Sequence, residues 1–402
     1  MHFHVLGLGP IGSLLSHHLR RAIPEIHPIT LIHRNPGQAR EALLRGSTIS
    51  VETNGITTAA TGFRSEIFEG LDATTEPGLR VDKSHTPESR PINSLFITTK
   101  AQETLPAIRR LRSRISNHST IVLLQNGMGV YEELVHKVFR DPQQRPHFIL
   151  ASNTHGAFLK SFYNVVHTGI GAIQFGIIPD PEKRDFESGF NDPNVEISER
   201  RARIADITTP EDPKFLQYKS LRDTVAALSL LEPLNISWTP ISQIQLVMRR
   251  KLVVNAVINP LTAIMGCRNG DIFTTDYADR IARRVCQEAA DVFAAQVRRE
   301  TQTWWDNLAE QGYDMESVTL GRIPRALMRV SLEEEVKRVT ELTRGNISSM
   351  LSDIRRGRGT EIDYINGYLL GLGSTYRVEM PATATLLNLV KMRSAIPLDQ
   401  ML

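Results

Sequence analysis

The 402-residue sequence predicts an α/β domain with a parallel sheet, followed by an all-α domain. Three observations carry this prediction. Short apolar runs alternate with helix-period segments through the first half, as in doubly wound parallel sheets. Long helix-period segments dominate after about residue 243. The length exceeds what one compact core usually takes, so two domains are expected. We place them at 1–240 and 241–402.

The apolar runs of the first half are expected to be strands because they are short and bounded by turn residues. They cover residues 2–6, 29–33, 94–99, 120–125 and 147–152. Helix-period segments lie between several of them, at 11–22, 103–112 and 130–139. A strand–helix alternation of this kind predicts parallel pairing, because parallel strands need a crossover connection.

The second half is expected to consist of helices at 243–265, 276–301, 324–343, 360–374 and 381–393. Two polar, proline-containing stretches interrupt the α/β pattern before it, at 65–93 and 179–214. Neither has a clear periodicity, so both are expected to be surface insertions of the N-terminal domain. The second is also expected to be mobile because it is dense in charge and proline.

The composition excludes several classes of protein. Apolar residues make up 41%, charged residues 23% and aromatic residues 6%, and the net charge is +3. This balance does not call for nucleic acid as a partner. No apolar run reaches the roughly 18 residues that suggest a membrane span, and the N-terminus lacks the features of a signal peptide. A cytoplasmic protein is therefore expected, with a homodimer left open because no long heptad seam argues for one.

The two cysteines, Cys267 and Cys286, exclude a disulfide scaffold and a multi-cysteine metal site, and they fit a reducing compartment. No cluster of His, Cys or carboxylate residues has the spacing of metal ligands, so no metal is expected.

A glycine-rich turn follows the first strand and opens the first helix. Its six residues are Gly7, Leu8, Gly9, Pro10, Ile11 and Gly12, which form the pattern G-x-G-x-x-G. In a dinucleotide-binding turn the first glycine permits the tight turn, the second lets the backbone approach a pyrophosphate, and the third allows close helix–strand packing. Backbone N–H groups and the helix dipole then hold the phosphates. The pattern and its position predict a Rossmann-type domain that binds NAD or NADP.

The end of the second strand distinguishes between these two cofactors. NAD sites usually place Asp or Glu there to bind the ribose 2′-hydroxyl. The sequence instead continues His33-Arg34-Asn35, without a carboxylate. Arg34 can form charge-assisted hydrogen bonds to a 2′-phosphate, so NADPH is favoured. The alternative is that Arg34 is an ordinary surface arginine.

Three polar residues are spaced one helical turn apart on the apolar segment that opens the second domain. Lys251, Asn255 and Asn259 stand at i, i+4 and i+8 and therefore share one helix face. A polar stripe in a buried helix is costly without polar partners, and a substrate in an inter-domain cleft would supply them. A desolvated lysine also has a lowered pKa, which suits a proton donor. A capping or inter-domain hydrogen-bond ladder is the alternative.

Several longer motifs carry a family resemblance. The segments KLVVNAVINPLTAI, QNGMG, NISSM and TEIDYINGYLL, with PATATLLNLVK near the C-terminus, resemble the ketopantoate reductases. The resemblance runs from the glycine turn to residue 391 and leaves out the two insertions. It implies a Rossmann-type NADP-binding domain followed by a helical substrate domain.

The resemblance also implies roles for individual residues. Lys251 would be the proton donor and Glu361 an active-site carboxylate that anchors the nicotinamide carboxamide, orients the substrate or tunes Lys251. Residues implied on the cofactor side are Lys100, Asn126, Ala157 and Glu361. Residues implied on the substrate side are Asn126, Lys251, Asn255, Asn259, Asn269, Asn346, Ser348 and Ser349, with Ser349 the strongest candidate of its segment.

Structural roles remain open for some of these residues. Lys100 could be a surface lysine and Asn126 a turn residue before a glycine. Ser348 or Ser349 could serve only as a helix N-cap, and Glu361 could serve only the dipole of the helix that it opens.

The function expected from the resemblance is NADPH-dependent reduction of 2-dehydropantoate to (R)-pantoate, a step toward pantothenate and coenzyme A. Hydride transfer to the ketone leaves charge on its oxygen, and Lys251 is the right type of group to neutralise it. One alternative is a D-2-hydroxyacid dehydrogenase acting on another branched 2-keto acid. A non-catalytic NADPH-binding scaffold is the other. A panel of 2-keto acids would discriminate among them.

Overall fold

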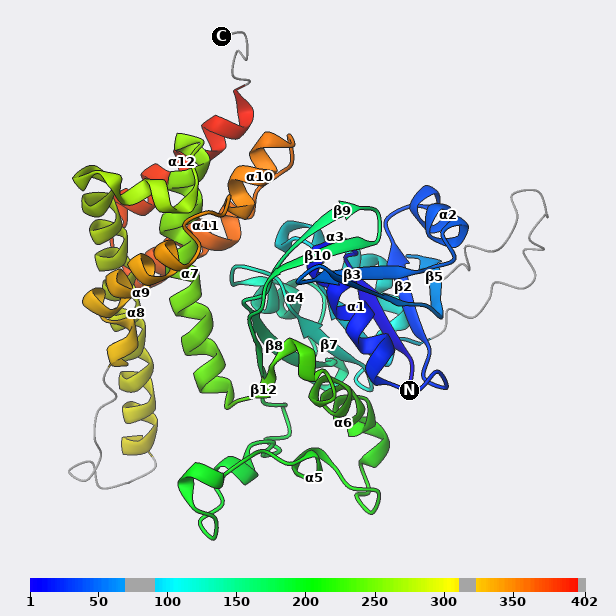
Figure 1. Ribbon diagram of the computed structural model, residues 1–402. Helices are drawn as coiled ribbons and strands as arrows, with labels where there is room; N and C mark the ends of the chain where they lie inside the picture. Colours follow the sequence, from blue (N-terminus) through cyan, green and yellow to red (C-terminus); the bar gives the residue numbers. More distant parts are fainter. Residues whose placement is uncertain (69–90, 311–322, 397–402) are drawn as a thin grey trace. The chain divides into compact units, whose positions relative to one another are not determined.

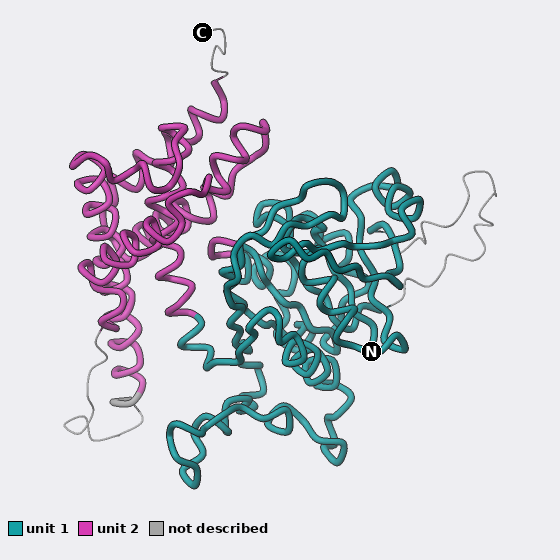
Figure 2. Tube along the Cα trace, in the orientation of Figure 1, with its two compact units in different colours: residues 1–125, 130–244 teal, residues 126–129, 245–402 magenta. Residues whose placement is uncertain are grey.

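The computed structural model describes residues 1–68, 91–310 and 323–396, and these form two compact units (Figures 1 and 2). Unit 1 contains residues 1–125 and 130–244, and unit 2 contains residues 126–129 and those from 245 onward. The short segment 126–129 thus groups with unit 2, although it lies between two elements of unit 1 in the sequence.

Unit 1 is built on a mixed sheet of eight strands. They are β1 (Phe3–Leu6), β2 (Ile29–His33), β5 (Phe63–Ile67), β6 (Ser94–Ile97), β7 (Thr120–Leu123), β8 (His147–Asn153), β11 (Ile173–Ile177) and β12 (Ile236–Trp238). Their order is β12-β11-β8-β7-β6-β1-β2-β5. The six neighbouring strands β8, β7, β6, β1, β2 and β5 are parallel to one another, whereas β11 runs antiparallel to β8. The α/β class is as predicted, and the antiparallel edge departs from the all-parallel expectation.

The five predicted strands are present, and the ones that were missed lie toward the sheet edges. Every residue of β1, β2, β6 and β7 is buried, as expected for strands covered by helices on both faces. The edge strand β5 has the sequence FRSEI, in which only Phe63 and Ser65 are buried. It carries no apolar run and so has no local signal of a strand, and the expectation that 65–93 lacks a regular element was wrong at residues 65–67. Residues 69–90 of that stretch lie outside the described part of the chain.

Five longer helices accompany this sheet: α1 (Pro10–Ala22), α2 (Pro36–Leu44), α3 (Ala101–Leu111), α4 (Val130–Lys137) and α6 (Phe215–Ser229). Helix α1 contacts α6, while α3 contacts α4, and α2 packs against β5 and β2. The apolar core beneath them includes Leu15 and Leu19 of α1 and Leu221 and Val225 of α6. This is the layered arrangement that the alternation of strands and helices predicted.

A second, four-stranded sheet was not predicted. It contains β3 (Ile49–Thr53), β4 (Ile56–Ala60), β9 (Gly156–Ser161) and β10 (Asn164–Gly169) in the order β4-β3-β10-β9. Helix α1 packs against all four strands (Figure 1). The turn between β3 and β4 is Asn54-Gly55, and both residues have positive φ. Asn-Gly in this conformation is the preferred two-residue hairpin turn, a signal that the sequence offered.

The second insertion, 179–214, contains three short helical pieces: η3 (Ser188–Phe190), η4 (Ile197–Glu199) and α5 (Ile204–Ile207). It was expected to lie on the surface, but Phe186 is buried in the core of unit 1 and packs edge-on against Tyr218. An Arg184–Asp212 ion pair joins two parts of the insertion, and Glu187 accepts a hydrogen bond from the Ile241 N–H at the start of α7. The insertion is therefore tied to unit 1 by both apolar and polar contacts.

Unit 2 is helical. Its main elements are α7 (Ile241–Met265), η6 (Asn269–Thr274), α8 (Asp276–Glu310), η8 (Arg325–Leu327), α9 (Arg329–Leu342), α10 (Ser349–Arg355), α11 (Ile362–Tyr376) and α12 (Pro381–Ala395). Residues 241–244 of α7 belong to unit 1. All five predicted helices are present. The predicted start of α9 at 324 was wrong because Pro324 and Met328 have extended backbone on either side of η8. Within the described residues, no helix is both long and apolar enough to cross a membrane.

Helix α7 continues through a proline because a neighbouring helix replaces the lost hydrogen bond. Pro260 has no N–H, so the carbonyl of Ala256, four residues earlier, loses its helical donor. The Asn366 side chain of α11 donates to that carbonyl (3.1 Å), and Asn366 is fully buried. A buried carbonyl without a partner would be costly, so Asn366 both satisfies α7 and fixes α11 against it.

Candidate functional site

The glycine turn has the geometry that a nucleotide-binding loop requires. Gly7 has φ +99°, and a Cβ there would lie 2.3 Å from the Thr99 amide nitrogen. A Cβ on Gly12 would lie 1.9 Å from the Gly7 carbonyl oxygen. At Gly9, by contrast, a Cβ would meet nothing within 4 Å. The outer glycines are therefore required by the fold, and the middle one leaves open space above the backbone.

The start of α1 fits the phosphates of a dinucleotide. Gly9 is the N-cap and provides no side-chain cap, and no acidic residue stands in the first turn. Pro10 at the first position has no N–H, while the Ile11 and Gly12 amides belong to the turn whose donors have no helical acceptor. Leu8 packs on the core and fixes the approach of the chain. Free amides at a helix N-terminus beside an open glycine suit pyrophosphate.

Arg34 directly follows β2, as predicted, but it is not alone there. Its guanidinium donates to the carboxylate of Glu103, in the first turn of α3. Strands β2 and β6, which precede these two residues, are the two neighbours of β1 in the sheet. No carboxylate follows the second strand in the sequence, but the structure places one beside Arg34 from a residue 69 positions away.

Two further cofactor-side candidates, Lys100 and Ala157, also lie in unit 1, whereas Asn126 and Glu361 belong to unit 2. Lys100 follows β6, is half-buried and stands at the N-cap of α3, where its carbonyl accepts the Glu103 N–H. Ala157 is in β9 opposite His167 of β10, in the sheet that packs against α1. Lys100 thus lies at the same sheet edge as the glycine turn, while Ala157 belongs to the second sheet.

The predicted proton donor is part of a polar group within unit 2. The Lys251 ammonium donates a hydrogen bond to the Asn126 side-chain oxygen (3.0 Å). Burial lowers the pKa of Lys251 from 10.5 to about 8, and the negative charge of Glu361 opposes that change. The structure therefore brings together Lys251, Asn126 and Glu361, although Lys251 is more than a hundred residues from each of the other two in sequence. It also brings the pKa of Lys251 closer to neutral pH.

Helix α11 holds Asn126 in place. The Met128 N–H donates to the Tyr364 carbonyl (2.9 Å). Gly127 has φ +82°, and a Cβ there would lie 2.5 Å from the same carbonyl. A Cβ on Gly129 would lie 3.0 Å from the Tyr368 ring. Both glycines of QNGMG are therefore needed for close packing on α11, a role that the sequence analysis did not assign.

Asn255 and Asn259 continue the polar stripe of α7. Positions four residues apart on a helix are separated by about 6 Å along its axis, and α7 is continuous from Lys251 to Asn259. Asn255 is half-buried and Asn259 is 8% exposed. Within the described residues, neither side-chain amide has a hydrogen-bond partner, so both remain available to a polar ligand.

Of the remaining predicted substrate residues, two are buried and hydrogen-bonded within the protein, and two are exposed. Ser348 is buried, caps α10 by accepting the Leu351 N–H (3.1 Å) and is hydrogen-bonded to Thr262 (2.7 Å). Asn269 is buried and donates from its side chain to Thr343 (2.9 Å). Asn346 and Ser349 are exposed. The N-cap alternative therefore applies to Ser348, and Asn269 has a structural bond of its own, although its side-chain oxygen has no partner.

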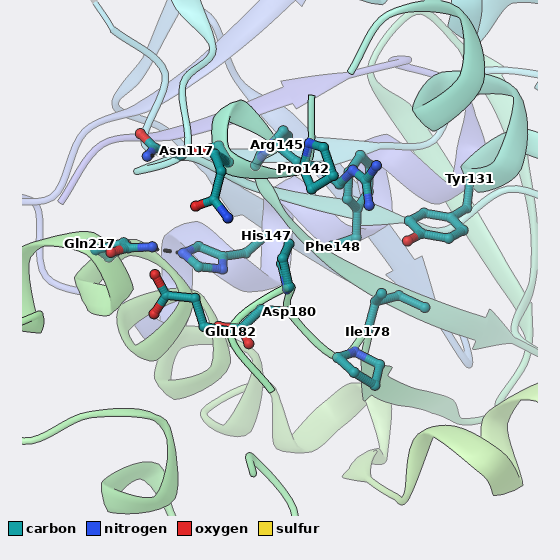
Figure 3. Close-up of a pocket in the computed structure, with 14 residues that line it drawn as sticks. Asn117, Tyr131, Pro142, Arg145, His147, Phe148, Ile178, Asp180, Glu182 and Gln217 are labelled. Carbon is teal, nitrogen blue, oxygen red and sulfur yellow. Dashed lines mark hydrogen bonds between the residues drawn. The ribbon is translucent and has the colours of Figure 1, made fainter. Parts of the chain in front are cut away.

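A pocket elsewhere in unit 1 contains none of the predicted site residues. It lies at the start of β8, where His147 is hydrogen-bonded to the Gln217 carbonyl (3.0 Å), and Asp180 and Glu182 lie nearby (Figure 3). It encloses about 30 Å³, which is room for roughly one water molecule. This pocket is too small for a substrate. In the described part of the chain, no three His, Cys or carboxylate residues are placed to hold a metal ion.

Comparison with known families gives two matches. Residues 3–180 match the model described as ketopantoate reductase PanE/ApbA, and residues 243–394 match the model of its C-terminal region. The chain is 24% identical over 390 residues to the probable 2-dehydropantoate 2-reductase of Schizosaccharomyces pombe, which covers 97% of this chain and 95% of that protein.

Among solved structures, D-mandelate dehydrogenase with NADH and anilino(oxo)acetate aligns with a TM-score of 0.66 at 17% identity, over 98% of this chain and 99% of that one. The probable 2-dehydropantoate 2-reductase from Bacillus subtilis aligns with a TM-score of 0.60 at 22% identity, over 98% and 100%. These likenesses show a shared fold.

Proposed function

The chain belongs to the ketopantoate reductase family, and from that premise we propose that it is a 2-dehydropantoate 2-reductase that uses NADPH. Its product would be (R)-pantoate, a precursor of pantothenate and coenzyme A. The Schizosaccharomyces pombe relative and the Bacillus subtilis structure carry this activity in their names. The observation that carries the proposal is the polar group formed by Lys251, Asn126 and Glu361 at the centre of the family's own motifs.

Lys251 is proposed as the proton donor. Reduction of the ketone adds hydride to its carbon and requires a proton at its oxygen. A lysine with a pKa of about 8 is mostly protonated at pH 7 and gives up its proton more readily than an ordinary lysine. The hydrogen bond to Asn126 fixes the Nζ position, and the charge of Glu361 keeps the ammonium form populated. After the transfer, the neutral amine regains a proton from water.

The rest of the polar stripe is proposed to hold the substrate. The free amides of Asn255 and Asn259 lie one and two helical turns beyond Lys251. Neutral amides can bind the carboxylate and hydroxyl groups of a small keto acid without adding charge that would compete with the lysine. Exposed Ser349, at the start of α10, is a further candidate.

Unit 1 is proposed to hold NADPH. The residues concerned are those of the glycine turn, for the pyrophosphate, together with Arg34 and Lys100, whose positive charges suit a 2′-phosphate. When bound, the nicotinamide supplies the hydride. The open space at Gly9 and the uncapped start of α1 support this assignment.

The test is turnover by the purified full-length protein. NADPH oxidation is followed at pH 7 with 2-dehydropantoate and with a panel of other branched 2-keto acids. We expect 2-dehydropantoate to give the highest kcat/KM. A protein that binds NADPH but oxidises it only with another keto acid would be a different D-2-hydroxyacid dehydrogenase, and one that oxidises it with none would be no reductase of this class.

A pair of variants tests the lysine. Lys251→Ala should lower kcat by two to four orders of magnitude while leaving the Kd for NADPH nearly unchanged, since the glycine turn, Arg34 and Lys100, which are proposed to hold the nucleotide phosphates, lie in unit 1. Lys391→Ala removes an exposed lysine that pairs with Asp363 and serves as the control. In the wild type, kcat for reduction should fall as pH rises above about 8, because the donor loses its proton. Equal turnover of the two variants would remove Lys251 from the mechanism.

A further inference from the structure

Arg34 and Glu103 form an ion pair that places a positive and a negative group side by side at the surface. Arg34 is 67% exposed and Glu103 is 47% exposed, so both side chains are open to solvent. Arg34 directly follows β2, and Glu103 lies in the first turn of α3, the helix that follows β6. Since β2 and β6 both pair with β1 in parallel register, their carboxyl ends flank the glycine turn that follows β1. The pair therefore lies beside the nucleotide-binding turn.

This position is where a dinucleotide of this fold places its adenosine ribose. In Rossmann-type domains, the residue at the end of the second strand contacts the ribose, as a carboxylate on the 2′-hydroxyl of NAD or as an arginine on the 2′-phosphate of NADP. Unit 1 presents both groups, Arg34 from the chain position that the rule names and Glu103 from the first turn of α3, which follows β6 on the other side of β1.

The two groups have opposite consequences for the two cofactors. A ribose 2′-hydroxyl can donate to Glu103 while Arg34 stays paired with it. A 2′-phosphate can accept from Arg34, but the Glu103 carboxylate then remains next to a phosphate of like charge. An ion pair between two exposed side chains is weak, so Arg34 is free to exchange partners, whereas the charge of Glu103 stays in place.

We propose that Glu103 is a cofactor-specificity residue, which weakens the preference for a 2′-phosphate so that the chain accepts NADH as well as NADPH. This inference rests on the proposed function only in requiring that unit 1 bind a nicotinamide dinucleotide. It does not depend on which keto acid is reduced.

The experiment measures cofactor binding to the full chain without any keto acid. NADPH and NADH are titrated separately and followed by fluorescence of the reduced nicotinamide, and adenosine 2′,5′-bisphosphate and 5′-AMP compete in parallel as probes of the ribose position. The variants are Glu103→Gln and Arg34→Ala. Glu132→Gln is the matched control because it also removes one acidic charge from the first turn of a helix of unit 1.

For Glu103→Gln we expect about three- to tenfold tighter binding of NADPH, because a like charge is removed, and unchanged or weaker binding of NADH. Arg34→Ala should weaken NADPH by at least tenfold and NADH much less. The affinity for adenosine 2′,5′-bisphosphate should change as that for NADPH does, and the affinity for 5′-AMP as that for NADH does. A gain in affinity for NADPH without a gain in affinity for NADH is a result that a merely structural role of Glu103 would not produce.

Two outcomes would overturn the inference. One is a Glu103→Gln variant whose affinities for both cofactors change together or not at all. The other is an equal gain in NADPH affinity for Glu132→Gln, which would trace the effect to net charge. Failure of the proposed function looks different: the cofactor ratio would shift in Glu103→Gln while 2-dehydropantoate is reduced with neither cofactor.

Discussion

Replacing Lys251 with methionine should stabilise unit 2 at neutral pH although it abolishes the proposed proton transfer. Methionine has a similar length and no charge, so it removes the ammonium without opening a large cavity. The prediction follows from the pKa of Lys251, which burial lowers from 10.5 to about 8. A group whose charged form is disfavoured by folding makes the folded state less stable wherever that form is populated.

The magnitude follows from the same pKa. Each tenfold change in a protonation equilibrium corresponds to about 1.4 kcal/mol, so the charged lysine costs the folded state up to about 3 kcal/mol at pH 7. Methionine also loses the hydrogen bond to Asn126, which is worth about 1 kcal/mol. The burial cost is larger, and Lys251→Met is therefore expected to raise the free energy of unfolding by about 2 kcal/mol.

The stability difference between Lys251→Met and the wild type should depend on pH. Between pH 8 and 10.5 the folded lysine binds fewer protons than the unfolded one, so the wild type gains stability as pH rises through this window. The advantage of Lys251→Met should therefore be fully present below pH 8 and shrink above it. Urea unfolding at pH 7 and pH 9.5 measures this, with fluorescence of Trp304 and Trp305 reporting on unit 2.

Lys391→Met is the control, because Lys391 is 51% exposed and its ion pair with Asp363 lies at the surface. Its effect should stay within about 0.5 kcal/mol at both pH values. The reasoning is refuted if Lys251→Met is less stable than the wild type at pH 7 and the gap between them does not change with pH.

Three further predictions concern the supports of the site and the acid sensitivity of unit 1. Gly127→Ala should lower kcat by at least tenfold with little change in the Kd for NADPH, because a Cβ would displace the segment from the Tyr364 carbonyl; unchanged kcat would contradict this. Asn366→Leu should lower the free energy of unfolding by about 1–3 kcal/mol in urea titrations, since the Ala256 carbonyl loses its partner, and an unaltered midpoint would count against it. All histidines precede residue 168, and burial lowers the pKa of His18 and His33 to about 4, so unit 1 should lose stability as pH falls from 6.5 to 4. Fluorescence of Trp238 should report this transition before that of the unit 2 tryptophans, and simultaneous loss would argue against it.

The parts of the fold that could be predicted from sequence are those with a local signal. Buried parallel strands appear in the sequence as apolar runs. The glycine turn can be predicted from its spacing because Gly7 and Gly12 have no room for a side chain. The small sheet was missed because its strands are half-exposed and polar; β4, for example, has only one buried residue. Its Asn54-Gly55 turn was a usable signal, since both residues adopt the positive φ that this dipeptide favours.

The candidate site was predicted as a set of residues but not as a set of contacts. The spacing of Lys251, Asn255 and Asn259 depends only on the period of one helix, and the structure retains it. The hydrogen bond between Lys251 and Asn126 joins positions 125 residues apart. No local rule predicts such a contact, because it depends on how 126–129 packs against α11.

The same limit explains why the carboxylate beside Arg34 was not predicted from the sequence. The rule for the second strand considers only the residues that follow it, and there it finds Arg34. Strand order places β6 on the other side of β1 from β2, and the first turn of the helix after β6 brings Glu103 into an ion pair with Arg34. Glu103 also has a local reason to be acidic, since it stands in the first turn of α3, where negative charge is favoured by the helix dipole. In the role proposed for Glu103, one carboxylate would stabilise a helix and oppose a 2′-phosphate, so a substitution in α3 would change cofactor preference without changing the residues after β2.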